Sequence, residues 1–172
     1  LAKLVQQIIE LSRLQGDDPI ALPAVVHVDK VVAASVDANA IDAEAKHIEV
    51  LVDGDQQCDV LGSHDQIIVA VSNLVANAVS YSPAGSRVVV RVTAHDEMVE
   101  IGVIDQGIGI PPTEIDRIFE RFYRVDPARH RSTGGTGLGL SIVKHVAATH
   151  GGEVRAWSVE GQGSTFTLGL PR

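Results

Sequence analysis

The sequence predicts an α/β fold, a two-layer sandwich with helices on one face of a mixed, mostly antiparallel sheet. Three observations support this fold class. Long segments carry apolar residues three or four positions apart, as amphipathic helices do. Valine-rich segments come in pairs joined by short turns, as antiparallel strands do. The 172 residues, 45% of them hydrophobic, suffice for one domain with one core, and no internal repeat divides them.

The N-terminal part is predicted to contain two helices and three short strands. The first helix has an apolar stripe that needs a partner, either in this domain or in another chain. The second helix is expected to begin at the N-cap Asp29, and the third strand to pair with the second. In order, the predicted elements are helix 1–14, strand 25–28, helix 29–46, and strands 48–52 and 59–61.

The central part is predicted to contain a long amphipathic helix followed by a hairpin. Ser63 is the expected N-cap of this helix, and Pro112 is expected to open a short helix after the hairpin. The predicted elements are helix 64–80, antiparallel strands 86–94 and 98–105, and helix 112–118.

The C-terminal part begins with a polar segment that contains proline and glycine and is predicted to be a mobile loop. A helix follows, which the pair Gly151-Gly152 is expected to end. The predicted elements are loop 125–135, helix 137–150, and strands 153–158 and 164–170, which form a closing hairpin.

The composition excludes several classes of protein. A formal charge of -8 disfavours nucleic acid as a partner, because its backbone phosphates favour lysine and arginine. The single Cys58 forms no internal disulfide, which fits a reducing compartment. No apolar stretch approaches the ~20 residues of a membrane-spanning helix. We expect no signal peptide, because no basic segment is followed by an apolar one. The chain opens on Leu1 within a helical pattern, so we expect a piece of a longer protein.

Two asparagines, Asn73 and Asn77, are one helical turn apart on the same face of the long helix. Amides on an otherwise apolar face need hydrogen-bonding partners or a ligand. In one interpretation Asn73 only bonds the backbone, and Asn77 alone is functional. In the other, Asn77 provides an oxygen ligand to Mg²⁺.

A carboxylate, Asp105, ends a predicted strand and enters the glycine-rich segment Asp-Gln-Gly-Ile-Gly-Ile. A carboxylate there can accept a hydrogen bond from an exocyclic amine such as that of adenine. Gly107 and Gly109 would let the backbone approach a planar ring closely. An ordinary Asp-Gly turn explains the same residues.

A second glycine cluster, residues 134–139, opens a helix and exposes backbone N–H groups at its N-terminus. Together with the helix dipole they form a site for an anion. The cluster lacks the Lys-Ser/Thr end of a Walker loop and does not open an early βαβ unit. Arg124, Arg129 and Arg131 are either phosphate contacts or plain surface charges.

In this order, the motifs resemble the catalytic, ATP-binding domain of bacterial sensor histidine kinases, which has the fold shared with gyrase-type and chaperone-type ATPases. The resemblance covers about residues 20–171. Within the family, the chain is most similar to sensors of the phosphate-responsive type. The motifs are Asn-Leu-Val-Ala-Asn-Ala (73–78), Asp-Gln-Gly-Ile-Gly-Ile (105–110), Ile-Phe-Glu-Arg-Phe-Tyr-Arg (118–124), Gly-Gly-Thr-Gly-Leu-Gly-Leu-Ser (134–141) and Glu-Gly-Gln-Gly-Ser-Thr-Phe (160–166).

The resemblance implies a role for each matching residue. Asn77 would ligate Mg²⁺, while Asn73 and Arg124 would act on the phosphate side as the catalytic residues. Tyr81 would stack beside adenine and Asp105 would bind the adenine amine. The other implied nucleotide-binding residues are Gly107, Gly109 and Ile110 under the ring, Gly135, Thr136, Gly137, Leu138 and Gly139 at the phosphates, and Thr165 in the closing segment.

The resemblance also implies cofactors, partners and a location. The cofactors would be ATP and Mg²⁺, and the reaction would transfer the γ-phosphate to a histidine of the protein's own dimerisation domain. A response regulator would then receive the phosphoryl group. Residues 1–16 would be the end of a dimerisation-domain helix, and residues 17–172 the catalytic domain. The domain would lie in the cytoplasm, as part of a membrane-anchored sensor.

Two features depart from the family's pattern. Ser80 stands where a lysine usually precedes the stacking tyrosine, which predicts a weaker affinity for ATP. No His-Glu-x-x-x-Pro phosphoacceptor motif accompanies any of the seven histidines. We therefore expect the chain to provide the nucleotide half of the reaction and to lack the acceptor half.

Three other functions compete with this one. Gyrase-type, mismatch-repair and chaperone ATPases place a general-base glutamate at the position of Asn73, whose neutral amide cannot take a proton from water. Anti-sigma-factor serine kinases lack the segment 118–124. A nucleotide-sensing module without catalysis would retain fewer of the motifs.

Overall fold

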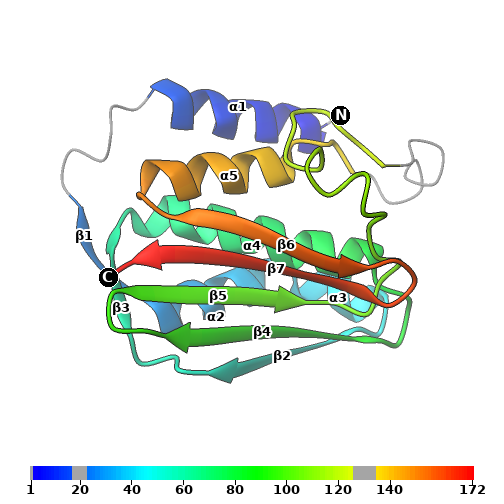
Figure 1. Ribbon diagram of the computed structural model, residues 1–172, viewed down its shortest axis with the longest axis horizontal. Coiled ribbons are helices and arrows are strands. Elements are labelled where there is room, and N and C mark those ends of the chain that lie inside the picture. Colours follow the sequence, from blue (N-terminus) through cyan, green and yellow to red (C-terminus); the bar gives the residue numbers. More distant parts are fainter. Residues whose placement is uncertain (1, 17–22, 126–134) are drawn as a thin grey trace.

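A five-stranded sheet forms one layer of the computed structural model, which describes residues 2–16, 23–125 and 135–172. The helices lie on one face of this sheet (Figure 1). This arrangement confirms the predicted two-layer α/β fold. In spatial order, the strands are β2 (Glu49–Gly54), β4 (Arg87–Ala94), β5 (Met98–Ile104), β7 (Gly163–Pro171) and β6 (Glu153–Val159).

The sheet is mixed and mostly antiparallel, as predicted. Only β2 and β4 run parallel, while the pairs β4–β5, β5–β7 and β6–β7 are antiparallel. Both predicted hairpins are therefore present. Alternation in β4 places Val88, Val90 and Val92 under the helices, where each is at most 1% exposed.

One predicted strand pairing is wrong. The segment expected to return beside β2 is β3 (Asp59–Gly62), and it pairs antiparallel with β1 (Ala24–His27) in a separate two-stranded sheet. The register places Val60 opposite Val26, and both side chains are almost fully buried. Pairing with β1 therefore buries the apolar residue of β3, while β2 takes β4 as its parallel neighbour.

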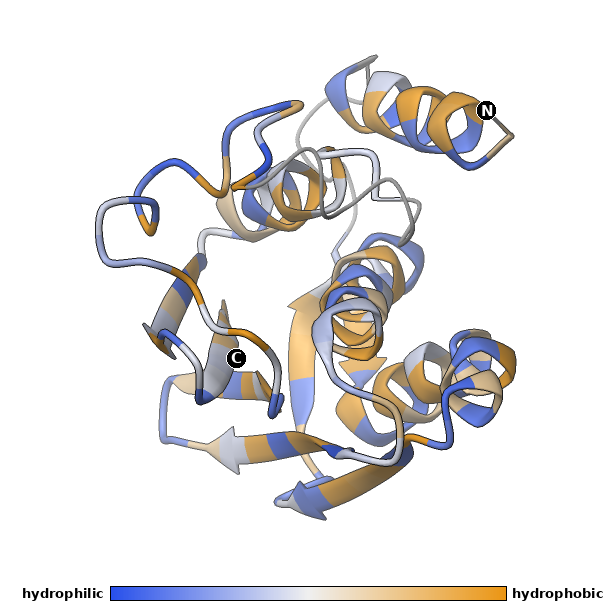
Figure 2. Ribbon diagram, turned by 90° about the vertical axis from the view of Figure 1, so that its right-hand side faces the viewer, coloured by the Kyte–Doolittle hydropathy of each residue, from blue (hydrophilic) through white to orange (hydrophobic). Residues whose placement is uncertain are grey.

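The central helix α4 (His64–Tyr81) contributes more buried apolar residues to the core than any other described helix. Its N-cap is Ser63, as predicted, whose hydroxyl accepts from the backbone N–H of Gln66 at 3.4 Å. Figure 2 shows apolar residues, in orange, along both the strands and the helices. The buried stripe of α4 consists of Ile67, Ala70, Val71, Leu74, Val75, Ala78 and Val79.

The helix predicted over 29–46 is two helices, α2 (Val28–Ala38) and α3 (Ala40–Ala45). The break lies at Asn39, whose side-chain amide donates to Ser35 O at 2.8 Å and to Ser72 O of α4 at 3.2 Å. Asparagine side chains compete for backbone groups in this way and disfavour a helix interior. The expected N-cap, Asp29, instead lies inside the first turn of α2, after the N-cap His27.

The helix predicted over 112–118 is not formed. Residues 111–120 form a succession of turns, with Glu114 N bonded to Pro111 O, Arg117 N to Glu114 O, and Glu120 N to Arg117 O. Such bonds over three residues do not build an α-helix. The apolar side chains of this segment are instead directed into the core, where Ile118 is buried and Phe119 packs edge-on against Phe166, with 6.3 Å between ring centroids.

Helix α5 (Gly139–Thr149) begins two residues later than predicted and ends near Gly151, as expected. Helix α1 (Ala2–Gly16) packs against it. Leu11 and Leu14 are buried there, and the ring of His145 in α5 bonds Leu14 O at 3.1 Å. The apolar stripe of α1 is only partly covered, since Val5 and Ile8 remain exposed. None of the described helices is long and apolar enough to cross a membrane.

Candidate nucleotide-binding site

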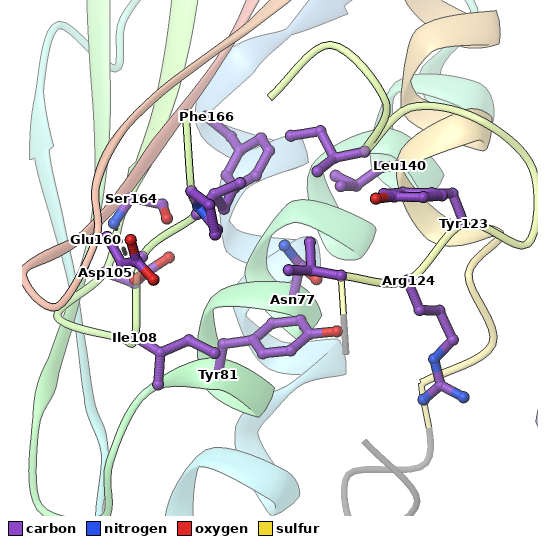
Figure 3. A pocket seen from close by; sticks show the side chains of 15 residues that line it. Asn77, Tyr81, Asp105, Ile108, Tyr123, Arg124, Leu140, Glu160, Ser164 and Phe166 are labelled. Atoms are coloured by element: carbon purple, nitrogen blue, oxygen red, sulfur yellow. Dashed lines mark hydrogen bonds between the residues drawn. The ribbon is translucent and has the colours of Figure 1, made fainter. Parts of the chain in front are cut away.

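A cavity of about 360 Å³ opens between the end of α4, the segment after β5 and the turn between β6 and β7. Figure 3 shows Asp105 and Ser164 at one end of the cavity and Arg124 at the other, with Asn77 and Tyr81 between them. Polar and apolar groups contribute about equally to the walls, and the apolar ones suit a planar ring. The apolar and aromatic lining residues are Ile108, Ile110, Pro111, Ile118, Tyr123, Val125, Leu140 and Phe166.

Asp105 is the buried carboxylate of this cavity. It is 7% exposed, and its Oδ1 accepts from the backbone N–H groups of Gly107 at 2.8 Å and Ser164 at 3.2 Å. No described residue donates to its second oxygen, Oδ2. Burial raises the pKa of Asp105, and the two backbone hydrogen bonds oppose that rise. The carboxylate is thus held in one orientation with an acceptor available to a ligand.

The two glycines after Asp105 have different roles. A Cβ at position 107 would lie 2.7 Å from Tyr81 O and 2.9 Å from Asp105 Oδ1, so glycine lets this turn pack against the end of α4. Gly107 does not line the cavity. Gly109 does, with a φ of 71° that favours glycine. The close approach predicted for Gly107 is therefore made to the protein's own backbone.

The two asparagines of α4 differ in their contacts. Asn73 donates to Val69 O at 2.8 Å, and its Oδ1 accepts from the side chain of Gln7 at 3.5 Å. Asn77 makes no side-chain hydrogen bond within the described part of the chain, and it lines the cavity. This difference fits the interpretation in which Asn73 bonds the backbone and Asn77 is the functional amide.

A smaller cavity of about 100 Å³ continues from the first toward α1. Asn77, Tyr81 and Arg124 line both cavities, so the two form one continuous site. The second glycine segment closes the smaller cavity at the start of α5. The predicted residues that line it are Asn73, Gly135, Thr136, Gly137 and Gly139.

The segment around Phe122 contacts the second glycine segment directly. Phe122 N donates to Gly137 O at 2.8 Å, and a Cβ on Gly137 would lie 2.7 Å from Phe122 Cα. Gly137 also has a φ of 76°. The neighbouring Tyr123 lies under the Arg117 guanidinium, 4.3 Å from the ring centroid. These contacts place Arg124 at the mouth that the two cavities share.

Two predicted residues lie outside both cavities besides Gly107. Leu138 is fully buried in the core, although its N–H bonds Thr136 Oγ1 at 3.4 Å. Thr165 is directed to the other face of the sheet, because Ser164 and Phe166 on either side of it line the cavity. The resemblance identified the closing segment but not which of its residues face the cavity. Arg129, Arg131, Gly134 and nearly all of the predicted loop 125–135 lie outside the described residues.

Sequence reasoning missed several lining residues. Glu160 and Ser164 come from the closing hairpin, and Lys3 and Gln7 come from α1. The alternation of β7 was a signal for Ser164. Nothing in the sequence indicated that α1 reaches the site.

Comparison with known proteins identifies the fold and the family. The family of histidine kinase-, DNA gyrase B- and HSP90-like ATPases matches residues 62–172. The sensor-like histidine kinase SenX3 of Mycobacterium tuberculosis is 47% identical over 171 residues, and the phosphate regulon sensor protein PhoR of Pseudomonas aeruginosa is 39% identical over 168 residues. These matches cover 99% and 97% of this chain, but only 42% of SenX3 and 38% of PhoR.

Two solved structures agree with this result. The mycobacterial sensor histidine kinase MprB is 34% identical with a TM-score of 0.75, and the match covers 87% of this chain and 97% of that one. Full-length ShkA in complex with AMPPNP is 30% identical with a TM-score of 0.82, and the match covers 98% of this chain and 35% of that one. The chain belongs to the histidine kinase-, DNA gyrase B- and HSP90-like ATPase family, and it is a catalytic ATP-binding domain of the sensor histidine kinase type.

Proposed function

We propose that this domain binds Mg²⁺-ATP in the continuous cavity and presents the γ-phosphate to a histidine of a dimerisation domain in the same protein. A response regulator then receives the phosphoryl group. The observation that carries the proposal is that the two ends of the site differ in chemistry. One end holds the oriented carboxylate Asp105, and the other holds Asn77, Arg124 and the second glycine segment.

Adenine occupies the end of the cavity at Asp105. The free oxygen of this carboxylate accepts the exocyclic amine, which guanine does not present at the same position. Tyr81 is half-buried beside Arg124 and lies along the adenine ring. The apolar wall at Ile110 and Phe166 covers the other surfaces of the base.

Asn77 is the residue that would hold Mg²⁺. Its amide oxygen is a hard ligand of the kind that Mg²⁺ takes, and it lies where the two cavities meet. The described residues contain no group of three metal-binding His, Cys, Asp or Glu side chains, which fits an ion held mainly by phosphates and water. When bound, the ion supplies positive charge to the phosphates during transfer.

Transfer is favoured over hydrolysis by the chemistry of Asn73. Its amide cannot act as a general base toward water, and its Nδ2 is engaged by Val69 O. What remains for the domain is to position the nucleotide and to stabilise charge, with Arg124 at the shared mouth. Residues 1–16 would then be the end of the dimerisation-domain helix and residues 17–172 the catalytic domain.

The comparisons support the wider setting of this proposal. The curated relatives SenX3 and PhoR are named sensor kinases, and PhoR is named for the phosphate regulon. We infer a cytoplasmic domain of a membrane-anchored, phosphate-responsive type of sensor. The bound AMPPNP of ShkA supports a triphosphate as the ligand of this fold.

A phosphotransfer assay tests the proposal. The chain is incubated with labelled ATP and Mg²⁺, alone and with a separately purified dimerisation domain that carries the phosphoacceptor histidine. We expect acid-labile phosphate on the added domain only, and a strong loss with Arg124→Ala. Phosphohistidine on the chain alone, or steady ATP hydrolysis without an acceptor, contradicts the proposal.

A further inference from the structure

Helix α1 is attached to the phosphate end of the site through Gln7. This side chain is only 9% exposed, although it is polar and comes from the first half of a peripheral helix. Its Nε2 donates to Asn73 Oδ1 at 3.5 Å, and its Oε1 accepts from the hydroxyl of Thr136. Gln7 thus connects α1 to both α4 and the second glycine segment.

Two further contacts fix the orientation of α1. Leu11 and Leu14 are buried in the core, and His145 bonds the carbonyl of Leu14. Together with Gln7, they define which face of α1 is turned toward the site. Lys3 lies one helical turn before Gln7 on that same face. Lys3 accordingly lines the smaller cavity, together with Asn77 and Ser80 of α4.

The smaller cavity is electrostatically suited to phosphates. Its described lining includes Lys3 and Arg124 and contains no carboxylate, although the whole chain carries a formal charge of -8. The larger cavity, by contrast, is lined by Asp105 and Glu160. Positive charge is therefore concentrated at one end of the site, where a polyanion would be stabilised.

The other lysines cannot supply this charge. The ammonium of Lys46 donates to the carbonyls of Val79, Ser80 and Ser82, so it is engaged beneath the end of α4. Lys30 and Lys144 lie on α2 and α5 and line neither cavity. Ser80, where the family pattern has a lysine, contributes no charge to the lining.

We propose that α1 is part of the nucleotide site, and that Lys3 binds the terminal phosphates and replaces the cation that Ser80 does not provide. The inference rests on the proposed binding of ATP in this cavity. The flexible stem of a lysine lets its ammonium reach a phosphate as a point charge. Adenosine, which has no phosphates, should be bound without any contribution from Lys3.

Calorimetry of the whole chain tests the inference, with AMP-PNP and Mg²⁺ as one ligand and adenosine as the other. Lys3→Met keeps most of the apolar stem and removes the charge. We expect it to weaken AMP-PNP binding about tenfold, as the loss of a charged contact to phosphate does, and to leave adenosine binding unchanged. Lys144→Met, on the exposed side of α5, is the matched control and should match the unmodified chain.

A second variant tests the link to Ser80. In the Lys3→Met background, Ser80→Lys places an ammonium on the opposite wall of the same cavity, and we expect it to restore most of the AMP-PNP affinity. If Lys3→Met and the unmodified chain bind AMP-PNP equally well, the inference about α1 is overturned and the proposed function stands. Tighter binding by Lys3→Met also overturns it, because α1 would then obstruct the phosphates. Failure of the unmodified chain to bind AMP-PNP overturns both this inference and the proposed function.

Discussion

Replacing Lys46 by methionine should destabilise the end of the helix that carries Asn77 and Tyr81. The ammonium of Lys46 donates to Val79 O at 2.8 Å, Ser80 O at 3.1 Å and Ser82 O at 2.7 Å. The first two carbonyls belong to the last turn of α4, where no intrahelical donor remains. The Lys46 side chain therefore acts as the C-terminal cap of α4.

The cost of the substitution follows from these three bonds. A hydrogen bond to a charged group contributes about 1.5–3 kcal/mol, and a cation at a helix C-terminus about 0.3–1 kcal/mol. The three bonds do not add fully, because they share one ammonium and the freed carbonyls can bond water. Burial also lowers the pKa of Lys46, which shows that desolvation opposes part of the gain. We expect a loss of about 2 kcal/mol.

Urea unfolding, followed by circular dichroism, measures this loss. Lys46→Met should lower the midpoint without changing the slope, and thermal unfolding should fall by about 4–8 °C. Lys30→Met, on the exposed side of α2, is the control and should change stability by less than about 0.5 kcal/mol. Equal stabilities of the two variants would refute the capping role of Lys46.

Three further predictions concern single residues of the site and its frame. Asp105→Asn should weaken ATP binding at least about tenfold and remove the preference for ATP over GTP, and calorimetry that finds equal ATP and GTP affinity in the unmodified chain contradicts this role. Because burial raises the pKa of Asp105, ATP binding by the unmodified chain should also weaken on acidification at a higher pH than for an ordinary aspartate. Asn77→Ala should abolish the Mg²⁺ dependence of ATP binding with an unchanged circular dichroism spectrum, and surviving Mg²⁺ dependence would leave Asn77 a structural residue. Burial lowers the pKa of His150 below its ordinary value of 6.5, and its Nε2 accepts from Ser63 N, so the folded state disfavours protonation of this ring. The stability of the folded chain should therefore be full above pH 6.5 and fall as the pH drops below it. If the urea midpoints of His150→Gln change with pH as steeply as those of the unmodified chain, His150 is not the responsible group.

Local patterns predicted most of the elements, and long-range pairing explains the errors. The hairpins β4–β5 and β6–β7 were predictable because their partners are adjacent in sequence. The pairing of β3 with β1 was not, because α2, α3 and β2 separate the two strands. The break at Asn39 combines a local bond to Ser35 O with a bond to Ser72 O, which lies 33 positions away, so only the first part could be read from the sequence.

The site was predictable where a motif lies on one segment. Asp105, Tyr81 and the second glycine segment line the cavities, as the motifs indicated. The participation of α1 was not predictable, because the contacts of Gln7 join residues 66 and 129 positions apart. Only the folded arrangement brings that helix over the phosphate end.

The two asparagines of α4 show what the fold adds to a motif. Spacing alone gives Asn73 and Asn77 the same face and equivalent chemistry. In the folded chain, Asn73 meets the start of α5 and Gln7 of α1, so its amide is bonded at both ends and helps to hold the second glycine segment near α4. Asn77, one turn closer to Tyr81, meets the point where the two cavities join and keeps its amide for a ligand. We therefore propose that the same side chain is structural at one position and binds the metal at the next, because packing around α4 differs over a single turn.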